Sequence, residues 1–176
     1  PDIKLLGVGA IDADGFIDPS VAACRKMTDL FNLRGDELAV ARSNSRAVNQ
    51  FPHDWRMATY SFNYLPILNE KGSVDTPQAE LPAHLDMVEK LKHAKEPVAL
   101  IMTGPLTDLA RALDVDPDIE QHIKKLYWMG GSLDGHGNVA MVNADGSQEW
   151  NSFWDPYAVK RVFDSNILIQ MVGLES

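Results

Sequence analysis

Short apolar runs alternate with helix-like patterns along most of the chain. The runs mark candidate strands at residues 3–11, 38–41, 97–102, 126–129 and 167–172. Apolar runs of this length, without regular polar alternation, are typical of strands covered on both faces, as in parallel sheets. Because strands and helices alternate, the sequence predicts βαβ units and an α/β fold with a mainly parallel, Rossmann-like sheet.

The segments between the apolar runs carry helix-start signals. Asp18-Pro19, Asp116-Pro117 and Asp155-Pro156 each place an N-cap residue before a proline, which is suited to the first helical position. They predict helices over residues 18–33, with an exit through 32–35, then from 116 to about 125, and over 155–163. Further helices are expected over residues 80–94 and from 104 to about 113.

Two segments, residues 42–80 and 135–146, have no sustained period. Long aperiodic loops in a compact domain are usually functional or mobile. In parallel sheets, ligands bind where loops leave the carboxyl ends of strands, so residues 12–14, 103–106 and 130–151 are expected to share one rim. Without an internal repeat or a linker, residues 1–176 are expected to form a single domain.

Charge narrows the class of partner. With 16 basic and 25 acidic residues the net charge is -9, and the basic residues are scattered, which argues against nucleic acid or an anionic membrane. The longest apolar stretch, residues 97–102, is far too short to cross a bilayer. The single cysteine, Cys24, cannot form an internal disulfide, which favours a reducing compartment and hence a cytoplasmic location.

Glu149 and Asn151 are the first candidate binding pair. Two residues apart, they can project to the same side of an extended segment and offer hydrogen-bond acceptors and donors to vicinal hydroxyls, such as those of a ribose. The alternative is that Asn151 and Asp155 only cap the following helix.

Trp55 is the second candidate. In a loop, its ring can stack on a planar heterocycle. The competing interpretation, which the pattern alone favours, is a tryptophan that fills the core beneath the loop. The five histidines lack the spacing of a zinc site, and the chain has no G-x-S-x-G nucleophile motif.

Taken together, several segments resemble the nucleoside hydrolase family along nearly the whole chain. They are Thr103-Gly-Pro-Leu-Thr-Asp-Leu-Ala110, Trp128-Met-Gly-Gly131, Asn138 in Gly-Asn-Val, Asp145-Gly, Glu149-Trp-Asn151 and Trp154-Asp-Pro156. Ala47-Val-Asn-Gln-Phe-Pro-His-Asp-Trp55-Arg, with Pro66-Ile-Leu-Asn69, is most similar to the purine-preferring (inosine–adenosine–guanosine) branch. The resemblance implies hydrolysis of the N-glycosidic bond of purine ribonucleosides to free base and ribose.

The resemblance also implies a role for individual residues. Thr103 would give its backbone carbonyl to an active-site Ca²⁺, and Asn138, Glu149 and Asn151 would hold ribose hydroxyls. Asp12 would contact the purine near its imidazole edge, and Trp55 would stack on the base. A calcium-bound water, deprotonated by an aspartate, would attack the anomeric carbon through an oxocarbenium-like transition state. Homo-oligomers, dimers or tetramers, are implied as well.

Parts of the family pattern have no counterpart in the chain. The aspartate cluster that binds calcium and supplies the general base would precede Pro1, and a further aspartate ligand and a histidine-bearing segment would follow Ser176. We therefore expect the chain to be the central portion of a hydrolase, truncated at both ends, and these 176 residues to be inactive alone. The alternatives are a non-catalytic nucleoside-binding remnant and a structural domain in which Trp55, Glu149 and Asn151 only support loops.

Overall fold

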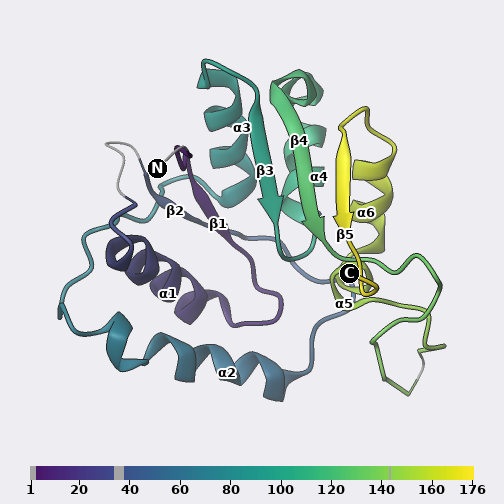
Figure 1. The fold of residues 1–176 in the computed structure, drawn as a ribbon, viewed down its shortest axis with the longest axis horizontal. Coiled ribbons are helices and arrows are strands. Elements are labelled where there is room, and N and C mark those ends of the chain that lie inside the picture. Colours follow the sequence, from purple (N-terminus) through teal and green to yellow (C-terminus); the bar gives the residue numbers. More distant parts are fainter. Residues whose placement is uncertain (1–2, 34–37, 143) are drawn as a thin grey trace.

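Parallel strands form two separate sheets in the structure, a computed structural model that describes residues 3–33, 38–142 and 144–176. In the first sheet, β1 (Val8–Ala10) pairs with β2 (Val40–Arg42). The second sheet has the order β3-β4-β5, with β3 at Val98–Met102, β4 at Ile123–Met129 and β5 at Ile169–Val172 (Figure 1). The predicted α/β class with parallel pairing is confirmed.

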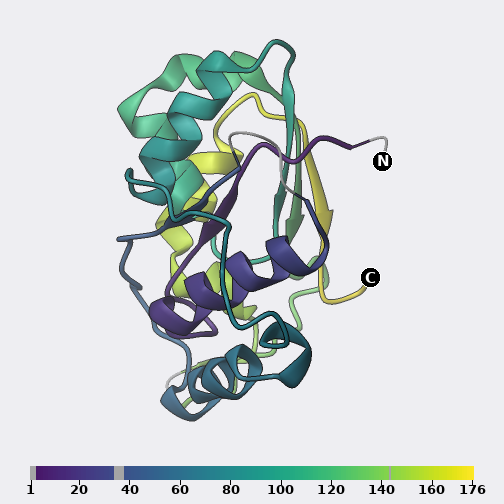
Figure 2. The ribbon, with the colours of Figure 1, turned by 90° about the vertical axis from the view of Figure 1, so that its left-hand side faces the viewer.

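Helices connect the strands and cover one face of the second sheet. They are α1 (Ile17–Leu30), α2 (His53–Asn63), α3 (Ala83–His93), α4 (Thr107–Val115), α5 (Trp150–Trp154) and α6 (Pro156–Phe163), with 3-10 turns η1 (Pro66–Leu68) and η2 (Pro117–His122). Figure 2 shows α3, α4 and α6 together on one side of the second sheet. Among the described residues, no helix combines the length and the apolar character needed to span a membrane.

The main core lies between the second sheet and these three helices. Leu126 and Trp128 of β4 are buried there against Leu109 and Leu113 of α4 and Val162 of α6. Burial alternates along most of β4 because successive side chains of a strand point to opposite faces. Burial of this apolar surface is the largest favourable contribution to folding.

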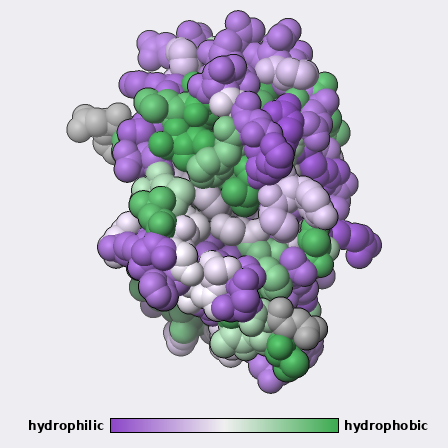
Figure 3. All heavy atoms as spheres, turned by 90° about the vertical axis from the view of Figure 1, so that its right-hand side faces the viewer, coloured by the Kyte–Doolittle hydropathy of each residue, from purple (hydrophilic) through white to green (hydrophobic). Residues whose placement is uncertain are grey.

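The other face of the second sheet is open in the described structure. Ile101 of β3 is 77% exposed, and Tyr127 and Met129 of β4 are 40% and 47% exposed. In the upper half of Figure 3, hydrophobic side chains gather on the left, the side of this open face. The right, where the helices lie, is mainly hydrophilic there. The prediction that the strands are covered on both faces is therefore wrong for β3 and β4 as described, because the helices that flank this sheet all pack on one side of it.

Several predicted element boundaries are wrong. The apolar run 3–11 is a strand only from Val8 to Ala10, and Ile3 is 80% exposed. The helix expected from 116 to about 125 is a 3-10 turn that stops at His122, because residues from Ile123 onward pair with β3. Residues 42–80, predicted to be irregular, contain α2. Of the exit predicted at 32–35, residues 34 and 35 lie outside the described residues, and Asn32 has a φ of 50°.

Replacing Leu126 by Ala tests the assignment of the main core. Leu126 has no exposed surface, so Leu126→Ala should lower the free energy of unfolding by about 2–5 kcal/mol through lost burial and a residual cavity. Leu133→Ala is the control, since Leu133 is 80% exposed and should change stability by less than about 0.5 kcal/mol. Denaturant unfolding measures both, and equal losses would contradict the assignment.

Candidate functional site

The carboxyl ends of β3 and β4 meet at the side chain of Asn151. Thr103 follows the last residue of β3, and Met129 is the last residue of β4. Asn151 Nδ2 donates to the carbonyl of Met129 at 3.0 Å and, more weakly, to the carbonyl of Thr103 at 3.5 Å. The amide nitrogen of Asn151 thus links the ends of the two strands.

Glu149 organises the start of α5. Its Oε1 accepts a hydrogen bond from the backbone N–H of Asn151 at 2.9 Å, and its Oε2 accepts from Ser152 N at 3.0 Å and from Gly131 N at 2.8 Å. Glu149 is 6% exposed, and these N–H groups supply the partners that a buried charge requires. Glu149 is therefore the N-cap of α5 and also ties α5 to the loop after β4.

The capping interpretation holds for Asp155 but not for Asn151. Asp155 is the N-cap of α6 and accepts from Ala158 N at 3.1 Å. Asn151 lies within α5, and its side chain contacts strand ends rather than a helix N-terminus. The two residues thus have different roles.

Asn138 lies beside Glu149 because the two arms of the preceding loop run close together. The backbone N–H of Asn138 donates to the carbonyl of Gln148 at 2.9 Å, and the Asn138 side-chain oxygen accepts from Trp150 N at 3.0 Å. A Cβ atom on Gly137 would lie 2.0 Å from the same Gln148 carbonyl oxygen, so this approach requires glycine. The amide nitrogen of Asn138 has no hydrogen-bond partner among the described residues.

Trp55 lies at the start of α2 and is 51% exposed. Its ring and that of the buried Trp150 meet in an edge-type contact with centroids 5.4 Å apart, and Trp150 in turn stacks on Phe51 with centroids 4.9 Å apart. The interpretation of Trp55 as a core residue is therefore wrong, because Trp150 and Trp154 are the tryptophans buried in the core beneath this loop. About half of the surface of Trp55 is exposed and can contact another group.

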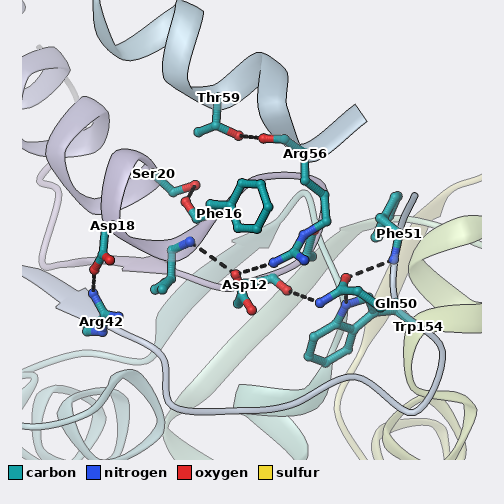
Figure 4. Close-up of polar contacts among 12 residues, drawn as sticks. Asp12, Phe16, Asp18, Ser20, Arg42, Gln50, Phe51, Arg56, Thr59 and Trp154 are labelled. Carbon is teal, nitrogen blue, oxygen red and sulfur yellow. Dashed lines mark hydrogen bonds and ion pairs between the residues drawn. The ribbon is translucent and has the colours of Figure 1, made fainter. Parts of the chain in front are cut away.

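Asp12 follows β1 and is held from two sides (Figure 4). Its Oδ1 accepts from the backbone N–H of Ile17 at 3.1 Å and from Arg56 Nη2 at 2.5 Å. Its backbone carbonyl accepts from Gln50 Nε2 at 2.9 Å, while Gln50 Oε1 accepts from Trp154 Nε1 at 2.9 Å. Gln50 thereby connects Asp12 to α5.

These residues surround one apolar cluster, which we call the site cluster. It consists of Ala13, Phe51, Val139, Trp150 and Trp154. The six residues singled out from the sequence all neighbour or contact it, directly or through Asn151: Asp12, Trp55, Thr103, Asn138, Glu149 and Asn151. Sequence reasoning missed Gln50 and Arg56, whose partners lie 38 and 44 residues away along the chain.

The loop after β4 is fixed by a carboxylate near the end of the described chain. Glu175 Oε1 accepts from the backbone N–H groups of Leu133 at 2.7 Å and Asp134 at 3.2 Å. Hydrogen bonds from the backbone N–H of His136 and from the Ser132 hydroxyl lower the pKa of Asp134 to about 2. His136 itself extends into solvent, with its imidazole 3.2 Å from Asp134.

The described residues do not by themselves fit a calcium ion. Within them there is no group of three or more His, Cys, Asp or Glu side chains placed to hold a metal. The Thr103 carbonyl, already in weak contact with Asn151, would supply one oxygen of the six to eight that Ca²⁺ takes.

In a comparison with known protein families, residues 1–176 match the inosine-uridine preferring nucleoside hydrolase family. The non-specific ribonucleoside hydrolase RihC of Escherichia fergusonii is 44% identical over 96 residues, 54% of this chain and 30% of RihC. The pyrimidine-specific ribonucleoside hydrolase RihA of Enterobacter sp. is 39% identical over 99 residues, 56% of this chain and 29% of RihA.

Solved structures give longer matches. The inosine-uridine preferring nucleoside hydrolase of Bacillus anthracis is 49% identical, with a TM-score of 0.95 over 99% of this chain and 57% of that chain. The purine-preferring ribonucleoside hydrolase of Gardnerella vaginalis has a TM-score of 0.72 at 24% identity, a likeness of fold alone. The chain thus spans little more than half of the length of these solved relatives.

Asn151→Asp tests the donor role of Asn151. An aspartate would place an oxygen opposite the carbonyls of Met129 and Thr103, so the free energy of unfolding should fall by about 1–3 kcal/mol. Asn44→Asp is the matched control, because Asn44 uses its side-chain oxygen to accept from Arg111 and an aspartate keeps that acceptor. Denaturant unfolding of both variants should show a loss only for Asn151→Asp, and equal stabilities would contradict the donor role.

Proposed function

The chain belongs to the nucleoside hydrolase family, and on that premise we propose that the whole protein hydrolyses the N-glycosidic bond of purine ribonucleosides to free base and ribose. The observation that carries the proposal is that a polar group, formed by the side chains of Asn138, Glu149 and Asn151, lies at the same site cluster as a half-exposed aromatic ring. That ring belongs to Trp55. Polar side chains suit the sugar hydroxyls, and the ring suits the base.

The ribose would bind the polar group. Glu149 Oε1 has one hydrogen-bond donor among the described residues, and a carboxylate oxygen has two acceptor sites, so it can still accept from a hydroxyl. Asn138 can donate from its amide nitrogen because its oxygen is occupied by Trp150 N. Groups already fixed by other hydrogen bonds need little reorganisation when positive charge develops on the sugar in an oxocarbenium-like transition state.

The base would stack on Trp55 and contact Asp12 near the imidazole edge of a purine. RihC acts without base specificity and RihA is pyrimidine-specific, so the relatives leave the base preference of this chain open. Our proposal of purine preference rests on the segment 47–56 and on the fixed carboxylate of Asp12.

We propose further that the whole protein uses Ca²⁺, with the Thr103 carbonyl as one ligand. When bound, the ion would supply an oriented and acidified water. Its other ligands would come from outside the described residues, since these do not complete a site. A homo-oligomer, a dimer or tetramer, is part of the same proposal.

Ribose release from inosine is the direct test. We expect the whole protein to release ribose in the presence of calcium, and chelation to abolish turnover until calcium is restored. The control adds chelator already saturated with calcium, which should leave the rate unchanged. Inosine binding without turnover would instead identify a nucleoside-binding protein, and absence of both would contradict the proposed function.

Trp55→Ala tests base stacking. Stacking of one base on an aromatic side chain contributes about 1–3 kcal/mol, so kcat/KM for inosine should fall by about 5- to 150-fold. Tyr64→Ala is the control, because Tyr64 is 72% exposed at the far end of α2, and its removal should leave kcat/KM unchanged. Similar losses in both variants would show that the effect of Trp55→Ala arises from α2 and not from stacking.

A further inference from the structure

Arg56 is a buried arginine whose partners all belong to the segment after β1. Its side chain is only 10% exposed. Its Nε donates to the carbonyl of Ala13 at 3.1 Å, and its Nη2 donates to Asp12 Oδ1 at 2.5 Å. The guanidinium carbon lies 4.2 Å from the centroid of the Phe16 ring, in a cation–π contact. Figure 4 shows the side chain of Arg56 reaching from α2 toward Asp12.

These contacts fix one oxygen of Asp12 and leave the other available. Oδ1 accepts from Arg56 and from the backbone N–H of Ile17. In the described residues no group donates a hydrogen bond to Oδ2, and the Asp12 side chain is 34% exposed. The carboxylate is thus rigidly oriented yet keeps a free acceptor, an arrangement suited to contact with a ligand.

Arg56 also links this carboxylate to the candidate stacking ring. Trp55 precedes Arg56 in α2, so the same helical turn that presents the ring holds Asp12. A shift of this turn would therefore move both base contacts together. A buried guanidinium with two hydrogen bonds and a ring contact resists such a shift, because any displacement would leave its charge unpaired.

We propose that Arg56 is a positioning residue that acts through Asp12 and thereby sets the preference for purine over pyrimidine nucleosides. The inference rests on the proposed function. Arg56 does not itself contact the substrate. It holds the Asp12 carboxylate where the imidazole ring of a purine would lie, and a uracil base, with its single ring, has no such ring to contact.

The test compares Arg56→Gln, Asp12→Asn and the double variant in the whole protein, with inosine and uridine as substrates. Arg56→Gln should lower kcat/KM for inosine by roughly 10- to 100-fold, since small displacements of a binding group have effects of this size. The kcat/KM for uridine should fall by less than about 3-fold, and this retained activity would also show that the variant is folded. Because Arg56 acts through Asp12, the double variant should be no worse with inosine than Asp12→Asn alone.

Two further variants separate positioning from general stability. Arg56→Lys keeps the charge but loses the fork that reaches both Ala13 and Asp12, so its loss with inosine should be intermediate. Arg42→Gln is the matched control, because Arg42 forms an ion pair with Asp18 that is exposed on both sides. Arg42→Gln should leave kcat/KM unchanged for both inosine and uridine.

The outcomes distinguish the inference from the proposed function. Equal losses for inosine and uridine, or additive losses in the double variant, would assign Arg56 a merely structural role. Unchanged inosine turnover in Arg56→Gln, with a loss in Asp12→Asn, would overturn the inference alone. If the unaltered protein shows no turnover, the same comparison is made on equilibrium binding of inosine and uridine, and absence of binding would overturn both.

Discussion

The buried carboxylate of Glu149 is the interaction on which the arrangement of the site depends. It accepts hydrogen bonds from the loop after β4 and from the first turn of α5, so it fixes the position of a five-residue helix that could not form alone. Other side chains of this helix then contact different segments of the chain. Asn151 reaches the ends of β3 and β4, and Trp154 reaches Gln50 in the loop after β2.

The site spans two sheets that share no strand pairing among the described residues. Asp12 and Trp55 belong to the β1–β2 part, whereas Thr103 and Glu149 belong to the β3–β5 part. Side-chain hydrogen bonds make the connection, together with two backbone hydrogen bonds from Val48 N and Asn49 N to the carbonyl of Trp154 at 2.9 and 3.1 Å. The buried carboxylate of Asp108 in α4 accepts from the hydroxyls of two serines in the loop after β2, Ser43 at 2.9 Å and Ser45 at 2.8 Å. Such bridges explain why so many polar groups are buried near the junction, since each must find a partner there.

The sequence was sufficient for what depends on local patterns. Apolar runs predicted the parallel strands, and the family motifs brought together the six candidate residues that the structure places around one cluster. It was insufficient where distant contacts decide. The buried residues of helix α2 are the polar Arg56 and Asn63, whereas its large apolar side chains are exposed, so hydrophobic periodicity does not report which face of this helix is buried. Nor could the pattern show which tryptophan is buried, since packing alone distinguishes Trp150 from the half-exposed Trp55.

The division between the sheets bears on how substrate preference can vary. Under the proposed function, the ribose contacts depend on Glu149 and α5, which are fixed by backbone groups of the β3–β5 part. The base contacts depend on Trp55 and Asp12, which are fixed to each other by Arg56 within the β1–β2 part. Because the two sets of contacts draw on different anchors, a substitution in the base-binding part can alter the preference for the base with little effect on the grip on the sugar. Gln50 limits this independence: it joins Asp12 to Trp154, so the base-binding part can move only as far as that bridge allows.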